Sequence, residues 1–253
     1  MILLKKWLPR LLLGLIFLFT LLLITAPAKL LENQLTSSVP GLRVQGTTGR
    51  SLSGQFRQLQ YQSILLEQVS WDLALSSLLT GNLGANIQVN DALFSGSFFI
   101  EQDFSGHTLI SNINATQSME ALVDLNAALQ FLTPFGHVNW TDVSLGFDQK
   151  NFNQAQGNIQ WKNARITVSG EAFTLGSIRL DLSIENNQLV LNLSSDPTLD
   201  LQGIIKLNRN GGYQLDMSIK EELPANIYNT IRLMARPDGN GRLEFSLKGI
   251  LRR

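Results

Sequence analysis

Apolar and polar residues alternate along much of this chain. In residues 213–219 and 242–248 every second side chain is apolar and its neighbours are polar. Such alternation is typical of a half-buried antiparallel strand, with one face on a core and the other in solvent. The same pattern, less strictly kept, predicts further strands at residues 55–66, 83–89, 93–99, 108–114, 138–147, 158–168, 177–184, 188–193 and 199–207.

Short segments rich in Asn, Asp and Gly separate these strands, for example Asn210-Gly211-Gly212 and Asp238-Gly239-Asn240-Gly241. Such segments join neighbouring antiparallel strands into hairpins. About a dozen strands joined in this way form a meander, and strand twist must curl so wide a sheet. The predicted fold is therefore mainly β: a large curled antiparallel meander, arranged as an open barrel, sandwich or trough.

Helical spacing interrupts the alternation at three places, and about three short helices are expected. Residues 71–79 and 119–132 place leucines on one side, and residues 224–234 begin with Pro224, which suits a first helical turn. We expect these helices to cap or fill the curled sheet.

The N-terminus differs from everything that follows it. Lys5, Lys6 and Arg10 precede an apolar run, and a helix over residues 11–31 would rise about 30 Å, the thickness of the hydrocarbon core. Because the cations lie before the run, the positive-inside bias places the N-terminus in the cytoplasm. The sequence thus predicts a cytoplasmic basic segment (1–10), a single transmembrane anchor (11–31) and a β-rich domain (32–253) on the other side of the membrane, which in a bacterial cell is the periplasm.

A cleaved signal peptide is the competing interpretation of this segment. Ala26-Pro27-Ala28 has the small residues of a cleavage site, and cutting after Ala28 would release the domain. The proline between the alanines and the Leu30-Leu31 pair beyond them favour a retained anchor. Both interpretations export the remaining chain.

Charge and cysteine content narrow the class of partner. Four of the twenty cations lie in the first 31 residues, so the exported part carries 16 cations and 20 acids, a net charge of about −4. Nucleic-acid binding is disfavoured, because it needs clustered Lys and Arg. The absence of cysteine excludes disulfides, cysteine-zinc sites and thiol nucleophiles.

One local pattern recurs three times. Val69, Val138 and Ile159 are each followed two residues later by a tryptophan, at positions 71, 140 and 161, so both side chains of each pair share a face of their strand. We expect these pairs to anchor the core of the sheet; an apolar groove wall is the sharper alternative.

Residues for catalysis, cofactor binding or metal binding are not evident, and none is assigned. His107 and His137 are the only histidines and lack ligand-spaced neighbours, and no Gly-x-Ser-x-Gly elbow or phosphate-binding loop occurs. Asp196, Asp200 and Asp238 lie in or beside expected turns, where Asp serves the backbone, and Glu221-Glu222 precedes an expected helix. The sequence therefore predicts a protein that is not an enzyme and needs no cofactor.

The chain resembles protein N of the bacterial type II secretion system, over almost its whole length. The resemblance is carried by Gly41 to Thr47, Val69-Ser-Trp71-Asp-Leu73, Leu78-Leu79-Thr-Gly81, Gly157-Asn-Ile-Gln-Trp161, Leu199-Asp-Leu-Gln-Gly203 and Pro237-Asp-Gly-Asn-Gly241-Arg, in that order. It implies an inner-membrane, periplasm-facing accessory of the secretion machine, which contacts other components of that machine.

Lipid binding and hydrolysis are the two alternative classes of function. A curled meander with an apolar concave face could bind or transfer lipid, as in AsmA-like and bridge-like proteins. An exported hydrolase is disfavoured, because a nucleophile or metal constellation is lacking. The sequence does not name the secretion component contacted or the oligomeric state.

Overall fold

The computed structural model describes residues 25–62, 64–92, 94–119, 132–168, 171–197, 199–222, 228, 232 and 235–250. Its strands form an antiparallel open sheet of fifteen strands, which confirms the predicted mainly-β meander. The chain divides into two compact units. Unit 1 comprises Met1–Leu73 and Ala85–Asp91, and unit 2 comprises Ala74–Gly84 and Ala92–Arg253.

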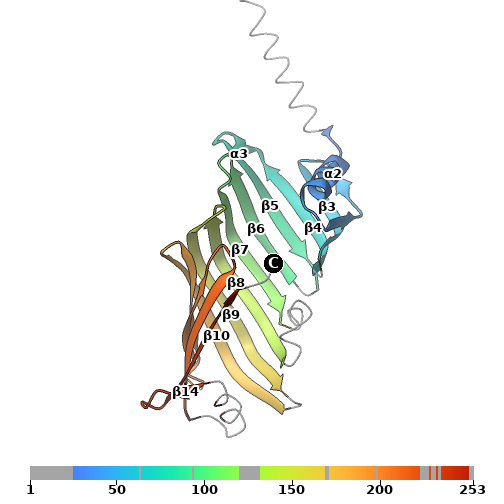
Figure 1. Ribbon diagram of the computed structural model, residues 1–253. Coiled ribbons are helices and arrows are strands. Elements are labelled where there is room, and N and C mark those ends of the chain that lie inside the picture. The colour runs from blue at the N-terminus through green and yellow to red at the C-terminus, as the bar shows by residue number, and fades with distance from the viewer. Residues whose placement is uncertain are drawn as a thin grey trace, which may run out of the picture. The chain divides into compact units, whose positions relative to one another are not determined.

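Unit 1 combines one helix with a small set of strands (Figure 1). In sheet order these strands are β1 (Leu42–Gln45), β3 (Ser53–Tyr61), β4 (Ile64–Ala74) and β5 (Asn82–Asn90), and β2 (Thr48–Gly49) pairs with β3 beside β1. Helix α2 (Ala28–Ser38) precedes them and packs against β1 and β2. The Thr47 hydroxyl, between these two strands, donates a hydrogen bond to the Glu32 carboxylate of α2.

The segment before α2 is hydrogen-bonded to the turn between β2 and β3. The Ser51 amide donates to the Ala26 carbonyl oxygen (2.8 Å), and the Ser51 hydroxyl donates to that of Pro27 (3.0 Å). Ala28 is buried directly after Pro27. These contacts attach residues 26–28 to the sheet of unit 1.

Residues 11–24 of the predicted anchor lie outside the described residues, and so does the whole basic segment 1–10. Residues 28–31 at the anchor's C-terminal end form the first turn of α2, which continues to Ser38. Across the described part of the chain, no helix has both the length and the apolar character needed to cross a membrane.

Unit 2 is a succession of hairpins (Figure 1). Strands that follow one another in the chain pair with each other up to β13. Strand β15 then pairs with β13 on one side and with β14 on the other. After α3 (Leu75–Leu78), its strands are β6 (Phe94–Asp103), β7 (Thr108–Ser118), β8 (Leu132–Phe147), β9 (Phe152–Val168), β10 (Glu171–Glu185), β11 (Gln188–Ser195), β12 (Gln202–Leu207), β13 (Gly212–Lys220), β14 (Arg236–Pro237) and β15 (Arg242–Ile250).

The sheet of unit 2 curls, as contacts between non-neighbouring strands show. Arg209, in the β12–β13 turn, donates from Nε to the Asp148 carbonyl oxygen in the β8–β9 turn (3.1 Å), and its guanidinium carbon lies 4.4 Å from the centre of the Phe147 ring. Leu175 of β10 likewise packs on a cluster that includes Leu243 of β15. Apolar side chains thus meet across the inner face of the curl.

Irregular residues follow one another across three strands of unit 2. The backbone φ angle is positive at Asn112 of β7, Asp142 of β8 and Gly157 of β9, at 54°, 46° and 98°. The β7–β8 and β8–β9 registers shift at these positions, as at β-bulges. Asp142 Oδ1 accepts a hydrogen bond from the Asn114 side-chain amide (3.0 Å), and Asn114 Oδ1 accepts one from the Asp142 amide (3.1 Å). These bulges, which we call the bulge row, increase the local bend and twist.

The predicted helices are recovered in part. Instead of a helix from Trp71 to Leu79, strand β4 runs through Ala74, and only Leu75–Leu78 are helical. The prediction for 119–132 lies almost wholly outside the described residues. In 224–234 only Tyr228 and Arg232 are described, and both are helical. The described residues therefore contain two helices, α2 and α3, rather than about three.

One predicted strand proves to be two. Residues 55–66 fold into the end of β3 and the start of β4, with Tyr61 paired to Ile64 across a tight turn. Gln62, in this turn, has a φ of 55°, which lies outside the extended range of a regular strand.

Candidate interaction site

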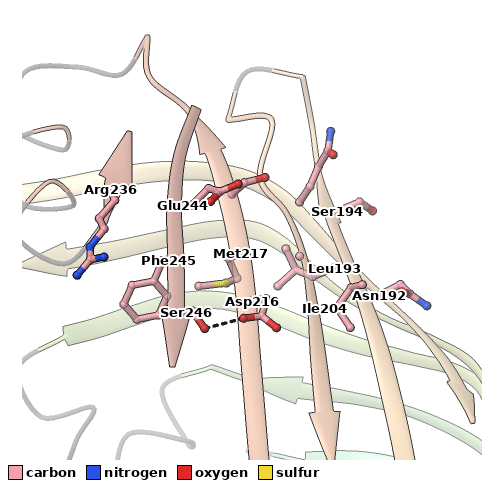
Figure 2. A pocket seen from close by; sticks show the side chains of 13 residues that line it. Asn192, Leu193, Ser194, Ile204, Asp216, Met217, Arg236, Glu244, Phe245 and Ser246 are labelled. Carbon is pink, nitrogen blue, oxygen red and sulfur yellow. Dashed lines mark hydrogen bonds between the residues drawn. The ribbon is translucent and has the colours of Figure 1, made fainter. Parts of the chain in front are cut away.

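A groove of about 970 Å³ lies over β11, β12, β13, β15 and β14 of unit 2 (Figure 2). Strand register builds it from two rows of side chains that cross the strands on one face. The first row is Ser194, Gln202, Ser218, Glu244 and Arg236; the second is Asn192, Ile204, Asp216 and Ser246.

This groove, which we call the polar groove, presents hydroxyls, amides and charges together with apolar side chains such as Ile204. Asp216 is its most strongly held carboxylate: it accepts hydrogen bonds from the Ser246 hydroxyl (2.6 Å) and the Gln214 side-chain amide (2.5 Å). These two bonds, the first chiefly, lower the pKa of Asp216 below its ordinary value. The groove therefore carries a fixed negative charge at neutral pH.

Arg242 braces one end of these strands. Its guanidinium donates to the Asp200 carboxylate (2.6 Å), to the Asp200 carbonyl oxygen (2.7 Å) and to the Ser218 hydroxyl (3.1 Å). One side chain thus connects β15, β13 and the residue two positions before β12. The hydrogen bond from Arg242 is the main reason that the pKa of Asp200 lies below its ordinary value of 3.8.

Asp200→Asn should destabilise unit 2 near neutral pH and progressively less in acid. A lowered pKa means that the folded state prefers the charged carboxylate, so the bond to Arg242 stabilises the fold above pH 4 and is lost as the pH falls through the pKa of the folded state. The melting temperatures of both proteins, measured from pH 7 to 3, should converge. Asp181→Asn, in a more exposed pair with Arg179, should shift melting little at any pH. A constant difference for Asp200→Asn would contradict the assignment.

The opposite face of the same strands is apolar. Leu243, Ile219, Leu199 and Ala235 form a buried cluster, and Leu243 is only 1% exposed. A cavity of about 160 Å³ lies in this cluster, lined by apolar side chains that include Leu201, Met217 and Phe245. This volume suits a side chain or a small apolar group.

The residues that the sequence analysis singled out lie away from the polar groove, apart from those at its Arg242 end. His107 closes the β6–β7 turn, where its amide donates to Asp103, and His137 lies in β8 opposite Lys162. Across the described residues, acidic and histidine side chains form no group of three that could hold a metal ion.

The acidic turn residues serve the backbone, as predicted. Asp196 accepts a hydrogen bond from the Ser177 amide (2.8 Å), and Asp238 accepts bonds from the amides of Asn240 and Arg242. Asp200 does more than predicted, because it holds Arg242. Glu221 accepts a hydrogen bond from the Tyr228 hydroxyl (3.1 Å), and the rest of the helix expected after it lies outside the described residues.

The repeated tryptophan pattern marks the core of the sheet. Trp71 is 5% exposed; its indole N–H donates to the Ser51 carbonyl oxygen (3.0 Å), and its ring centre lies 4.3 Å from that of Phe56. Trp140 and Trp161 are half-buried and share one cluster. The two patterns are register partners, since Val138 pairs with Trp161 and Trp140 with Ile159. Core anchoring is confirmed for Trp71 and holds in part for the other two.

The polar groove is not evident in the amino-acid sequence. Most residues of its two rows are outward-facing polar positions of five strands, and each of them alone is unremarkable for a solvated strand face. Only the registers of β11 to β15 bring them into two rows.

Comparisons with known proteins agree with the resemblance. A family model described as "Type II secretion system (T2SS), protein N" matches residues 40–246. A Type II secretion system protein N of Vibrio cholerae is 25% identical over 223 residues, covering 83% of this chain and 86% of that protein. One of Aeromonas hydrophila is 24% identical over 243 residues, covering 90% and 92%. No solved structure matches. The chain therefore belongs to the type II secretion system protein N family.

Proposed function

We propose that this protein is a non-enzymatic, inner-membrane accessory of the type II secretion system, whose β domain lies in the periplasm and contacts other components. The observation that carries the proposal is the family match, which spans almost the whole described sheet, from the residues before β1 to β15. A sheet domain of this kind acts by contact, and its surfaces for contact are the polar groove and the sheet edges.

The contacts before α2 support a retained anchor over a cleaved signal peptide. Cleavage after Ala28 would remove Ala26 and Pro27, whose carbonyl oxygens accept hydrogen bonds from Ser51, together with the buried Ala28 itself. An anchor that begins at residue 11 and ends before Ala26, rather than at 31, and the cytoplasmic basic residues before it are part of the proposal, with the domain on the periplasmic side.

The polar groove supports binding rather than turnover. Its best-placed carboxylate, Asp216, is held ionised by Ser246 and Gln214, which suits a fixed charge better than a proton-transferring acid. The Ser246 hydroxyl and the Gln214 side-chain amide both donate to this carboxylate. The groove therefore suits recognition of polar surface.

The test is co-purification of the tagged full-length protein from carbonate-washed, detergent-solubilised membranes, with and without crosslinking in vivo. We expect recovery in the washed membranes and enrichment of secretion-system components, together with impaired or altered secretion when the gene is deleted. A soluble form beginning at Lys29 would contradict the anchor.

The lipid-binding alternative is an outcome of the same experiment. The apolar cavity beside Leu243 and Phe245 is the observation that favours it. Reproducible recovery of phospholipid or lipopolysaccharide precursors, without secretion components, would replace the proposed function with lipid binding.

A further inference from the structure

Among the described residues, strand β15 has no pairing partner on the outer side of its second half. The Asp238 amide donates to the Arg242 carbonyl oxygen on the β14 side, whereas the Gly241 carbonyl oxygen accepts from Glu221 on the β13 side. Backbone groups alternate between the two sides along an antiparallel strand, and the β13–β15 register has no shift. The N–H and C=O groups of Ser246, Lys248 and Ile250 therefore point away from β13.

β14 covers only the start of this edge. Its two residues pair with Glu244 and Leu243. Ala235, which directly precedes β14, is buried in the apolar cluster on the opposite face of the strands. Among the described residues, no strand pairs with the outer side of β15 from Phe245 to Ile250. We call this stretch the β15 edge.

The side chains of the β15 edge define what a pairing strand must offer. Phe245 and Leu247 lie on the face of Met217 and Leu215, whereas Ser246 and Lys248 lie on the face of the polar groove. A strand added here would place apolar residues beside the first pair and polar residues beside the second.

Lys248 places a positive charge on the β15 edge, diagonally across from the Asp216 carboxylate of the polar groove. Lys248 takes part in no ion pair among the described residues, and its row neighbour Lys206 is already paired with Glu185. Arg252 and Arg253 follow in the sequence, and no acidic residue occurs after Glu244. Pairing with a second copy would bring like charges together, so an acidic partner strand fits better.

We propose that the β15 edge binds an extended segment of another secretion-system protein by strand addition, and that this segment alternates apolar residues with acidic ones, an acidic residue lying beside Lys248. The inference rests on the proposed function and names the contact through which it is exercised. Backbone hydrogen bonds at Ser246, Lys248 and Ile250 provide affinity, and the alternation provides selectivity.

The edge is tested by Lys248→Pro in the full-length membrane protein. Proline removes an outward-pointing N–H and leaves the bonds of Leu247 and Gly249 to β13 in place, so the sheet should still form. Lost hydrogen bonds and charge should reduce the recovery of secretion-system components about tenfold. Lys248→Gln keeps the donor and loses only the charge, so we expect a smaller loss. Equal melting temperatures would show that all three proteins fold alike.

Site-specific photocrosslinking identifies what occupies the edge. A photoreactive residue replaces Leu247 (44% exposed) or, as the matched control, Leu78 of α3 (45% exposed). We expect an adduct at position 247 but not at position 78, and we expect Lys248→Pro to abolish it. The partner peptide mapped from the adduct should alternate apolar and acidic residues. Adducts only with a second copy or with lipid would overturn the inference.

The two proposals fail in different ways. If the wild-type protein recovers secretion components and a folded Lys248→Pro recovers them equally well, strand addition at β15 is wrong and the proposed function stands. If no secretion component is recovered, but position 247 still captures an alternating acidic peptide in a proline-sensitive manner, the edge binds a partner outside that system and the proposed function is wrong.

Discussion

Trp71→Ala is expected to unfold unit 1 or leave it marginally stable. The side chain is 5% exposed, packs on Phe56 and donates to the Ser51 carbonyl oxygen. Replacing a buried tryptophan by alanine costs about 3–5 kcal/mol, and here the hydrogen bond to the β2–β3 turn is lost as well. Urea titration followed by circular dichroism, with limited proteolysis of the region before Leu73, measures the effect.

Two further variants separate packing from other causes. Trp71→Phe keeps an aromatic ring against Phe56 and loses the N–H donor, so it should cost less than the alanine substitution. Tyr61→Ala, in the neighbouring strand β3, truncates an exposed aromatic side chain and should have a small effect. If Tyr61→Ala and Trp71→Ala were equally destabilising, the burial assigned to Trp71 would be incorrect.

Gly157→Ala should destabilise unit 2 by about 3 kcal/mol, although it adds only one methyl group. The φ angle at Gly157 is +98°, where L-residues are rarely found. A Cβ atom would also lie 2.6 Å from the Asp142 carbonyl oxygen and 2.6 Å from the Val143 Cα, and both are backbone atoms that cannot move aside. Thermal unfolding of the variant against the wild-type protein tests this.

Gly239→Ala is the matched control for that experiment. Gly239 also has a positive φ, +80°, but nothing lies within 4 Å of the added Cβ. Its cost should be about 1 kcal/mol, from the backbone conformation alone. The difference between the two variants measures the steric part, and similar costs would mean that strands β8 and β9 approach less closely than described.

Much of the sheet was predictable because it has one apolar and one polar face. The alternation over residues 242–248 predicted all but the last two residues of β15, and the predicted strand at 83–89 lies within β5. Strand ends were less predictable. The helical leucine spacing after Trp71 competes with strand pairing, and β4 extends through Ala74 because Trp71 packs against Phe56 of β3.

The interaction surfaces could not be predicted in the same way. The polar groove and the β15 edge depend on which strands are neighbours and on the register between them. Gln202 and Glu244 look like ordinary solvated residues in the sequence, and only two intervening pairings place them in one row. A one-residue slip changes the register of only one strand pair, but it would disrupt a row of side chains that spans five strands.

The bulge row has a consequence for how the sheet finds its alignment. A regular antiparallel strand can slide by two residues against its neighbour and still keep every apolar side chain on the inner face, so alternation alone does not select one alignment. Gly157 must meet Asp142, and Asp142 must meet Asn114, for the backbone and the paired side chains to fit. A two-residue slip separates these partners on three strands at once. The irregular residues therefore select a single alignment for a long, repetitive sheet, which its regular residues could not specify.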